Sequence, residues 1–125
     1  MRLFAFVLLL LGGPQAALAA EPFVGTWSTG SSLGLPRCSL DDDGRLILRP
    51  NSETGYEHYC KFVAKRRLTT NSWNITSTCT GEGAKWRMNS TVTVEGNRLV
   101  YHVISGGRAG TNTYERCGSP AKQRR

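Results

Sequence analysis

Residues 73–94, WNITSTCTGEGAKWRMNSTVTV, decide the fold, because apolar and polar side chains alternate along both halves of this stretch. A period of two is typical of half-buried antiparallel strands rather than of an amphipathic helix. The Gly81-Glu82-Gly83 segment between the halves has the composition of a short hairpin turn. One face of the predicted hairpin carries Trp73, Ile75, Ser77 and Cys79 on the first strand, and Trp86, Met88, Ser90, Val92 and Val94 on the second.

Shorter runs of the same kind flank the hairpin. We expect further strands at Phe23–Ser28, Arg45–Arg49, Tyr56–Phe62, Leu99–Ser105 and Thr111–Cys117, with polar loops at Asn51–Gly55 and Gly106–Gly110. Together these runs make roughly seven or eight short strands, the number that closes a small barrel or sandwich. No window offers a helical stripe. The sequence therefore predicts one all-β domain, a small antiparallel up-and-down barrel.

The N-terminus has the composition of a signal peptide. Met1-Arg2 is followed by an unbroken apolar run, Leu3–Leu11, and then by a small-x-small cleavage pattern at Ala17-x-Ala19. The apolar run is much shorter than the roughly 20 residues that span a bilayer. We therefore expect a signal peptide at 1–20, a barrel domain at 21–117, a disordered basic tail at 118–125, and a periplasmic or secreted product.

Four cysteines follow the leader, at Cys38, Cys60, Cys79 and Cys117. In an exported chain of this size an even cysteine count predicts two disulfides. Three connectivities are possible, and we favour Cys38–Cys60 with Cys79–Cys117, because closing loops between sequence neighbours costs the least entropy. The spacing contains no Cys-x-x-Cys, and both histidines lie elsewhere, so no metal site is expected.

Positive charge exceeds negative charge. The net charge of +7 falls to +6 once Arg2 leaves with the leader, and three more positive residues lie in the tail. The dense basic cluster Lys61, Lys65, Arg66 and Arg67 is either a solvated hairpin end or a patch for an anionic partner. The remaining excess of about +3 is too small for a dedicated nucleic-acid binder, so no nucleic acid is expected.

A resemblance lies at the two ends of the mature chain. Phe23-Val24-Gly25-Thr26-Trp27 opens it, and Tyr114-Glu115-Arg116 stands near its end. This pattern resembles the calycin bracket of lipocalin-like barrels, which implies that Trp27 closes the barrel base and Arg116 packs across its indole. The opening is also similar to the small exported barrels of the bacterial alkaline-protease inhibitor family. That likeness implies a disulfide loop from Cys38 to Cys60 and a flexible N-terminal trunk that enters a protease. Cys79 and Cys117 depart from that family's single bridge, and Glu21-Pro22 makes a short trunk.

Other chemical motifs favour structural interpretations. His58 and His102 are the only imidazoles, and no Gly-x-Ser-x-Gly elbow is present, so an enzyme is not expected. Asp41-Asp42-Asp43-Gly44 resembles part of a calcium loop, but Ser52 stands where the bidentate glutamate is needed, which favours a solvated turn. Gly106–Gly110 is expected to be a flexible loop rather than an anion cradle. Asn74 and Asn89 begin glycosylation sequons whose use depends on the host.

These observations predict an exported, non-enzymatic binding protein without a cofactor, with a protease-inhibitor-like role as the sharpest suggestion. Its partner is expected to be a protein or an anionic envelope or host component. The alternatives are a secreted effector of a host-associated bacterium and, less favoured, a small periplasmic enzyme. The sequence leaves the oligomeric state and the identity of the partner open.

Overall fold

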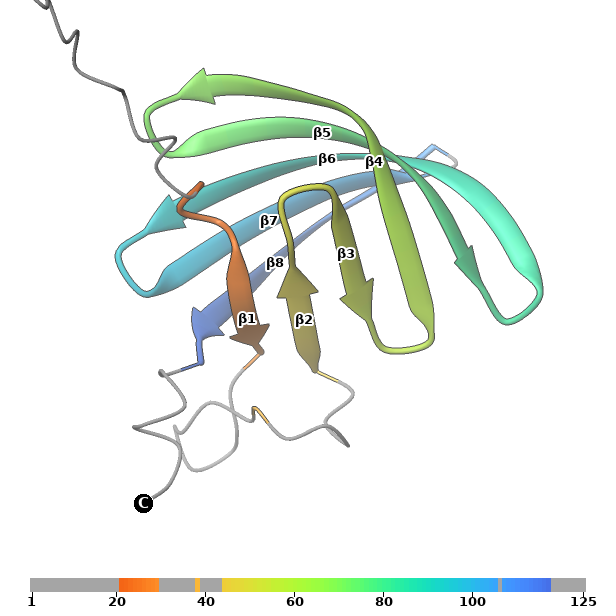
Figure 1. The fold of residues 1–125 in the computed structure, drawn as a ribbon, viewed down its shortest axis with the longest axis horizontal. Helices are drawn as coiled ribbons and strands as arrows, with labels where there is room; N and C mark the ends of the chain where they lie inside the picture. Colours follow the sequence, from red (N-terminus) through yellow and green to blue (C-terminus); the bar gives the residue numbers. More distant parts are fainter. Residues whose placement is uncertain (1–20, 30–37, 39–43, 106, 118–125) are drawn as a thin grey trace, which may run out of the picture.

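The fold is a closed barrel of eight antiparallel strands, each paired with its neighbours in chain order (Figure 1). The computed structural model describes residues 21–29, 38, 44–105 and 107–117. The predicted signal peptide, the Asp41–Asp43 turn and the basic tail lie outside these ranges. The strands are β1 (Gly25–Ser28), β2 (Arg45–Leu48), β3 (Ser52–Gly55), β4 (His58–Thr69), β5 (Ser72–Gly81), β6 (Ala84–Glu95), β7 (Arg98–Ser105) and β8 (Arg108–Arg116). The prediction of an all-β antiparallel barrel is confirmed, and the described residues include no helix able to cross a membrane.

The strands differ in length. β4 to β8 have 8 to 12 residues each and form the long curved wall, whereas β1, β2 and β3 have four residues each and complete the closure (Figure 1). The hairpin predicted from residues 73–94 is β5 and β6. Its ladder runs without a break from Ser72 opposite Thr93 to Gly81 opposite Ala84. Glu82 and Gly83 form its turn with positive φ values of 47° and 78°.

Two predicted loops were wrong. Residues 52–55 form β3, a strand without apolar alternation, because its most buried side chain is the charged Glu53. The Gly106–Gly110 loop is shorter than predicted, since β8 already begins at Arg108 and Gly107 turns with φ 81°. Tyr56 was expected to begin a strand, but it lies before β4 and is 60% exposed.

The core fills the barrel with aromatic and aliphatic side chains. Phe23 and Trp27 are fully buried, and the indole Nε1 of Trp27 donates to the Phe23 carbonyl at 2.9 Å. The Phe23 and Trp73 rings meet edge to face, with centroids 5.1 Å apart. The buried cluster is Phe23, Trp27, Leu46, Leu48, Cys60, Trp73, Ile75, Cys79, Met88, Val92, Val94, Leu99 and Tyr101.

The predicted disulfide connectivity was wrong. The two bridges are Cys38–Cys117 and Cys60–Cys79, with sequence separations of 79 and 19 residues. Strand register explains the second bridge, because Cys60 on β4 lies directly opposite Cys79 on β5 with Cα atoms 4.0 Å apart. Loop-closure entropy, on which the prediction relied, ignores this register. By the chain-entropy relation the bridges contribute about 4–5 and about 3 kcal/mol.

Gly25, Trp27 and Arg116 lie together where β1 pairs with β8. The Arg116 guanidinium lies 4.2 Å from the centre of the Trp27 ring, and the two residues are directly opposed between β1 and β8. Arg116 also donates to the Pro22 carbonyl at 2.8 Å. Gly25 leaves room for this arginine, since a Cβ there would lie 2.9 Å from the Arg116 Nη1 atom. The contact ties the two ends of the described chain together.

Candidate functional site

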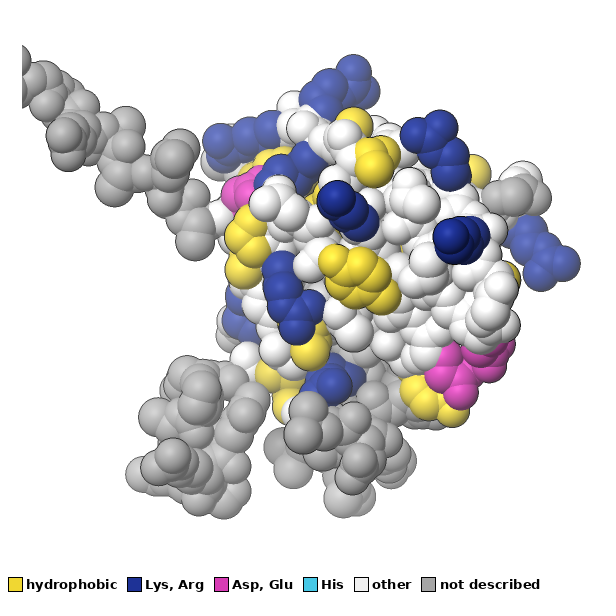
Figure 2. All heavy atoms as spheres, turned by 45° about the vertical axis from the view of Figure 1, so that its right-hand side comes forward, with side chains coloured by type: hydrophobic (Ala, Val, Ile, Leu, Met, Phe, Trp, Pro, Cys, Tyr) yellow, Lys and Arg dark blue, Asp and Glu magenta, His cyan; other side chains and the backbone are white. Residues whose placement is uncertain are grey.

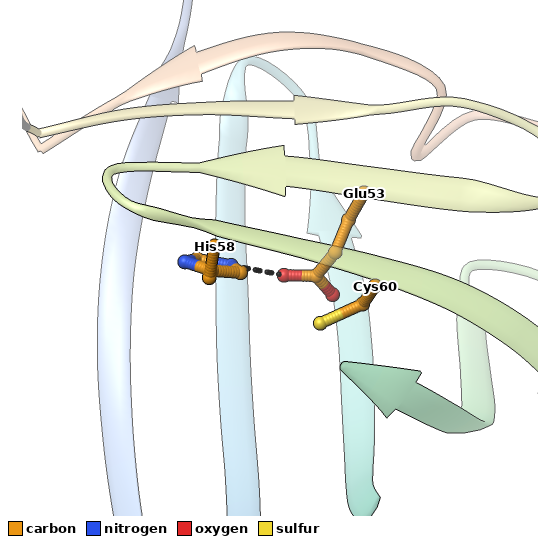
Figure 3. Close-up of side chains that lie close together, drawn as sticks. All are labelled: Glu53, His58 and Cys60. Carbon is orange, nitrogen blue, oxygen red and sulfur yellow. Dashed lines mark hydrogen bonds and ion pairs between the residues drawn. The ribbon is translucent and has the colours of Figure 1, made fainter. Parts of the chain in front are cut away.

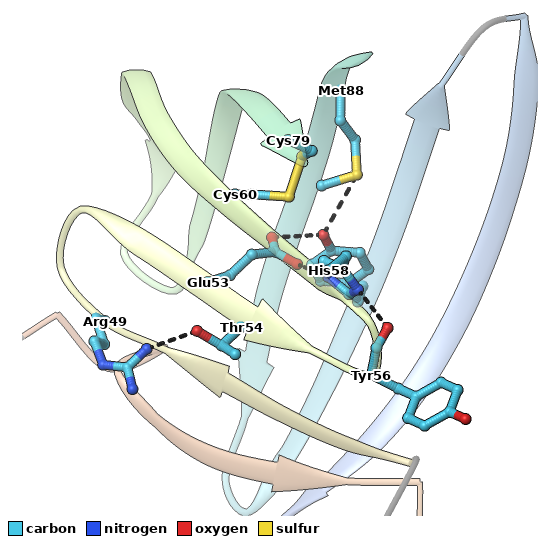
Figure 4. A network of polar contacts seen from close by, with 9 residues as sticks. Arg49, Glu53, Thr54, Tyr56, His58, Cys60, Cys79 and Met88 are labelled. Atoms are coloured by element: carbon cyan, nitrogen blue, oxygen red, sulfur yellow. Dashed lines mark hydrogen bonds and ion pairs between the residues drawn. A yellow bond between two sulfur atoms is a disulfide. The ribbon is translucent and has the colours of Figure 1, made fainter. Parts of the chain in front are cut away.

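A polar cluster lies inside the barrel around the carboxylate of Glu53. This side chain extends from β3 into the interior and is only 1% exposed. Its Oε1 atom accepts a 2.7 Å hydrogen bond from the Tyr101 hydroxyl, and its Oε2 atom lies 3.1 Å from Nε2 of His58 (Figure 4). A buried carboxylate needs such partners, because an unpaired charge in an apolar interior is very costly.

The contacts of His58 favour its imidazolium form. Its Nε2 faces the Glu53 carboxylate, and its Nδ1 faces the Tyr56 carbonyl at 3.2 Å, so both neighbours are acceptors. Only the imidazolium form donates from both nitrogens at once. The hydrogen bond to Glu53 accordingly raises the pKa of His58, although partial burial opposes the shift. The two contacts orient the imidazole ring between β3 and the segment before β4.

Tyr101 completes the interior cluster as a neutral phenol. Burial raises its pKa strongly, and the adjacent Glu53 carboxylate raises it further, so the hydroxyl stays protonated and donates. The Met88 sulfur lies 3.9 Å from the same hydroxyl oxygen. The ring of Tyr101 packs edge to face against Tyr114, with centroids 6.1 Å apart. These contacts fix the phenol in place between β3 and β7.

Cys60 lies next to this cluster. Donor atoms of Glu53, His58 and Cys60 all lie within 4.8 Å of one another, a spacing compatible with a metal ion (Figure 3). The Cys60 sulfur is bonded to Cys79, however, and a disulfide sulfur is not the thiolate that binds metals. In the oxidised protein only Glu53 and His58 of this trio remain as donors.

The expectation that both histidines lie away from the cysteines was wrong for His58. His58 and Cys60 are two residues apart on β4, and alternate residues of a strand share a face. That spacing was a usable signal in the sequence. The contribution of Glu53 was not, because it depends on the register that places Glu53 opposite Cys60.

The predicted basic cluster divides between two faces of β4. Lys61 is opposite Thr78, and Arg66 is opposite Asn74, both on the outer surface. Lys65 and Arg67 are instead opposite the buried Ile75 and Trp73, and therefore lie on the inner face. The structure does not bring all four cations into one patch.

The two inner cations cover the end of the core. The Lys65 ammonium contacts the Glu21 carboxylate, donates to the Pro50 carbonyl at 2.8 Å and lies 5.5 Å from the centre of the Phe23 ring. Arg67 lies 5.5 Å from the centre of the Trp73 ring. Its guanidinium also donates to the carbonyls of Thr69 and Thr70 at 3.0 and 2.8 Å. The contacts of both side chains are with residues of the barrel, and they stabilise the fold.

The outer cations belong to a larger surface, which we call the basic face. Register aligns Lys61, Thr78 and Arg87 in one row, and Tyr59, Thr80 and Lys85 in the next. The strands β4 and β5, and β6 as far as Val94, contain no Asp or Glu, whereas Glu82 lies in the turn between β5 and β6. Figure 2 shows Lys and Arg side chains spread over the surface, with acidic side chains confined to small areas. The basic face comprises the exposed residues Tyr59, Lys61, Arg66, Lys85 and Arg87.

The two sequon asparagines meet on the outer surface of β5 and β6. Asn74 donates to Oδ1 of Asn89 at 3.0 Å, and Asn89 donates back to Oδ1 of Asn74 at 3.2 Å. Both residues lie inside strands and are part-buried. Their amides are therefore occupied by each other in the folded protein.

No protein-family model, curated protein sequence or solved structure matches the chain. The resemblance to lipocalin-like barrels and to the protease-inhibitor family therefore stays a prediction. The two disulfides fit an oxidising environment outside the cytoplasm.

Proposed function

We propose that the protein is an exported binding protein that engages an anionic partner protein through the basic face. The observation that carries this proposal is the alignment of Lys61, Lys85 and Arg87 on neighbouring strands without an intervening carboxylate. Such a one-sign surface attracts acidic partners and increases the rate of encounter. Tyr59, at 48% exposure, adds an aromatic side chain of the type that anchors protein interfaces.

Binding is favoured over catalysis by the interior chemistry. Both imidazole nitrogens of His58 face acceptors, the Glu53 carboxylate and the Tyr56 carbonyl, which supports a structural role for this ring. The other imidazole, His102, contacts the Thr111 hydroxyl on an outer strand surface through its Nδ1 atom at 2.8 Å. A threonine hydroxyl beside this half-buried histidine lacks the third group that orients a nucleophilic site.

A protease-inhibitor mechanism based on an N-terminal trunk receives little support. Glu21 contacts Lys65, the Pro22 carbonyl accepts from Arg116, and Phe23 is fully buried. From Glu21 onward the chain is held against the barrel, so no described residue forms a projecting trunk. An inhibitory role would have to use another surface, and the basic face is the one with charge to recognise a partner.

The experiment compares two double variants that lose the same charge. Lys61→Gln/Arg87→Gln removes one row of the basic face, whereas Arg98→Gln/Arg108→Gln removes two arginines from β7 and β8. Each protein is used to capture partners from extracytoplasmic extracts and is also loaded on a poly-L-glutamate resin. We expect the first variant to lose the captured partner and to elute at lower salt, while the second behaves like the wild type. Equal loss in both variants would show that net charge, and not this face, governs binding.

A further inference from the structure

Three potential metal ligands, Glu53, His58 and Cys60, have donor atoms within 4.8 Å of one another on β3 and β4, and Cys79 of β5 is bonded to the third. Glu53 lies opposite Cys60 in the β3–β4 ladder, and Cys60 lies opposite Cys79 in the β4–β5 ladder. His58 precedes Cys60 by two residues on the same face, and its Nε2 atom is 3.1 Å from the Glu53 carboxylate. Two of the donors are withheld only because their sulfur atoms are joined.

We propose that reduction of the Cys60–Cys79 disulfide creates a Zn²⁺ site formed by Glu53, His58, Cys60 and Cys79. A dithiol reductant supplies two electrons and two protons, which convert the disulfide to two thiols while the reductant becomes a cyclic disulfide. Zn²⁺ then binds both sulfurs as thiolates, and the two thiol protons leave to solvent. The imidazolium of His58 also releases its Nε2 proton, because only neutral imidazole binds a metal.

Strand pairing, and not the disulfide alone, holds the four side chains near one another. β4 and β5 are paired from Tyr59 to Thr69, and this ladder keeps the two sulfur atoms on facing positions after reduction. The β3–β4 ladder holds Glu53 against Cys60 in the same way, from Ser52 opposite Lys61 to Gly55 opposite His58. The donors are therefore preorganised by register, which lowers the cost of collecting them around an ion.

The donor set suits zinc better than a hard cation. Two thiolates, one imidazole and one carboxylate make a four-coordinate set of the types that Zn²⁺ prefers, with ligand distances of about 2.0–2.3 Å. The ligand atoms of Glu53, His58 and Cys60 are already within 4.8 Å of one another, so small side-chain movements bring them to those distances. Tyr101 donates to the other carboxylate oxygen and acts as an outer partner that orients Glu53.

The proposal is independent of the basic face, and its test uses cobalt as a spectroscopic substitute for zinc. The full-length mature protein is reduced anaerobically with dithiothreitol, freed of reductant and titrated with Co²⁺. We expect the visible bands of tetrahedral cobalt together with thiolate-to-metal charge transfer, and loss of both when Zn²⁺ is added. The oxidised protein should give neither signal. Reduced protein with the same spectrum as the oxidised form would overturn the proposal.

Variants assign the ligands. Reduced Cys60→Ser/Cys79→Ser protein should lose the thiolate bands, whereas Cys38→Ser/Cys117→Ser should keep them. His58→Gln and Glu53→Gln should each weaken binding by more than about tenfold, since changes in outer partners alone cost about 10–100-fold. A spectrum and affinity unchanged in both of these variants would leave only a dithiol site and contradict the four-ligand assignment.

A second readout needs no substitution. In reduced wild-type protein, saturating Zn²⁺ should protect Cys60 and Cys79 from alkylation, while Cys38 and Cys117 react. Peptide mass mapping distinguishes these cysteines. Equal labelling of all four cysteines in the presence of zinc would contradict the site even if the serine variants fail to fold.

Discussion

The two inner cations of β4 and its two outer cations have similar chemistry and opposite surroundings. Lys65 and Arg67 lie over the Phe23 and Trp73 rings and close the end of the core. Lys61 and Arg66 stand on the outer surface opposite Thr78 and Asn74. Lys65 and Arg67 therefore contact the core, whereas Lys61 and Arg66, close by in the sequence, point to solvent.

A β-bulge causes this division. The β4–β5 register shifts between Phe62 and Ala64, so that Val63 has no partner of its own and is 51% exposed. Strict alternation from Lys61 would place Lys65 on the outer surface, but one extra residue turns it to the inner face. Because of the bulge, Lys65 and Arg67 pack over aromatic rings of the core.

The largest expected effect is on the free energy of unfolding, and it separates an aromatic residue of the inner face from one of the outer face. Trp73→Ala on the inner face should lower the free energy of unfolding by about 3–5 kcal/mol, because it empties a buried aromatic site. Tyr59→Ala on the outer face should change it by no more than about 0.5 kcal/mol. Urea unfolding followed by fluorescence from the remaining tryptophans measures both. Comparable losses would mean that Tyr59 is part of the core.

The next effect concerns the cations themselves. Lys65→Ala/Arg67→Ala should destabilise the protein by about 1–2 kcal/mol, because each side chain loses a contact with an aromatic ring and hydrogen bonds to carbonyls. Lys61→Ala/Arg66→Ala should stay within about 0.5 kcal/mol of the wild type, as is usual for exposed charges. Urea midpoints at constant salt give the comparison. A larger loss for the outer pair would reverse the assignment of faces.

A smaller effect depends on pH and separates the inner and outer histidines. The pKa of His58 is raised in the folded protein, so its stabilising contribution is complete below the unfolded pKa of about 6.5. That contribution is lost as pH rises through the higher folded pKa. His58→Gln should therefore remove part of the decline in wild-type stability as pH rises from about 6.5 through the folded pKa of His58.

His102→Gln is the matched control for this measurement, because His102 contacts a threonine hydroxyl on the outer surface and no carboxylate in the described part of the chain. Its unfolding free energy should follow the wild-type pH profile. If His58→Gln gives a profile parallel to that of the wild type from acid to alkaline pH, the paired imidazolium does not contribute as described.

Alternation of apolar residues was enough to find β5 and β6, and with them the inward side chains Ile75 and Val92. It was not enough for β3, because the inward residue there is Glu53, whose buried carboxylate is paired with Tyr101 of the distant strand β7 and with His58 of the neighbouring strand β4. The Cys60–Cys79 disulfide and the split of the basic cluster both follow from strand register, and no local pattern revealed the bulge at Val63. What the sequence could not predict was therefore set by contacts between strands.

The most direct test of the account measures two properties on two variants of equal charge, Lys61→Gln/Arg66→Gln and Lys65→Gln/Arg67→Gln. The properties are the urea midpoint and the salt concentration that elutes the folded protein from a poly-L-glutamate resin. We predict a crossed result, in which the outer variant elutes earlier with an unchanged midpoint and the inner variant unfolds earlier with nearly wild-type elution. Equal shifts of both properties in both variants would contradict the division of β4 into a stabilising and a binding face.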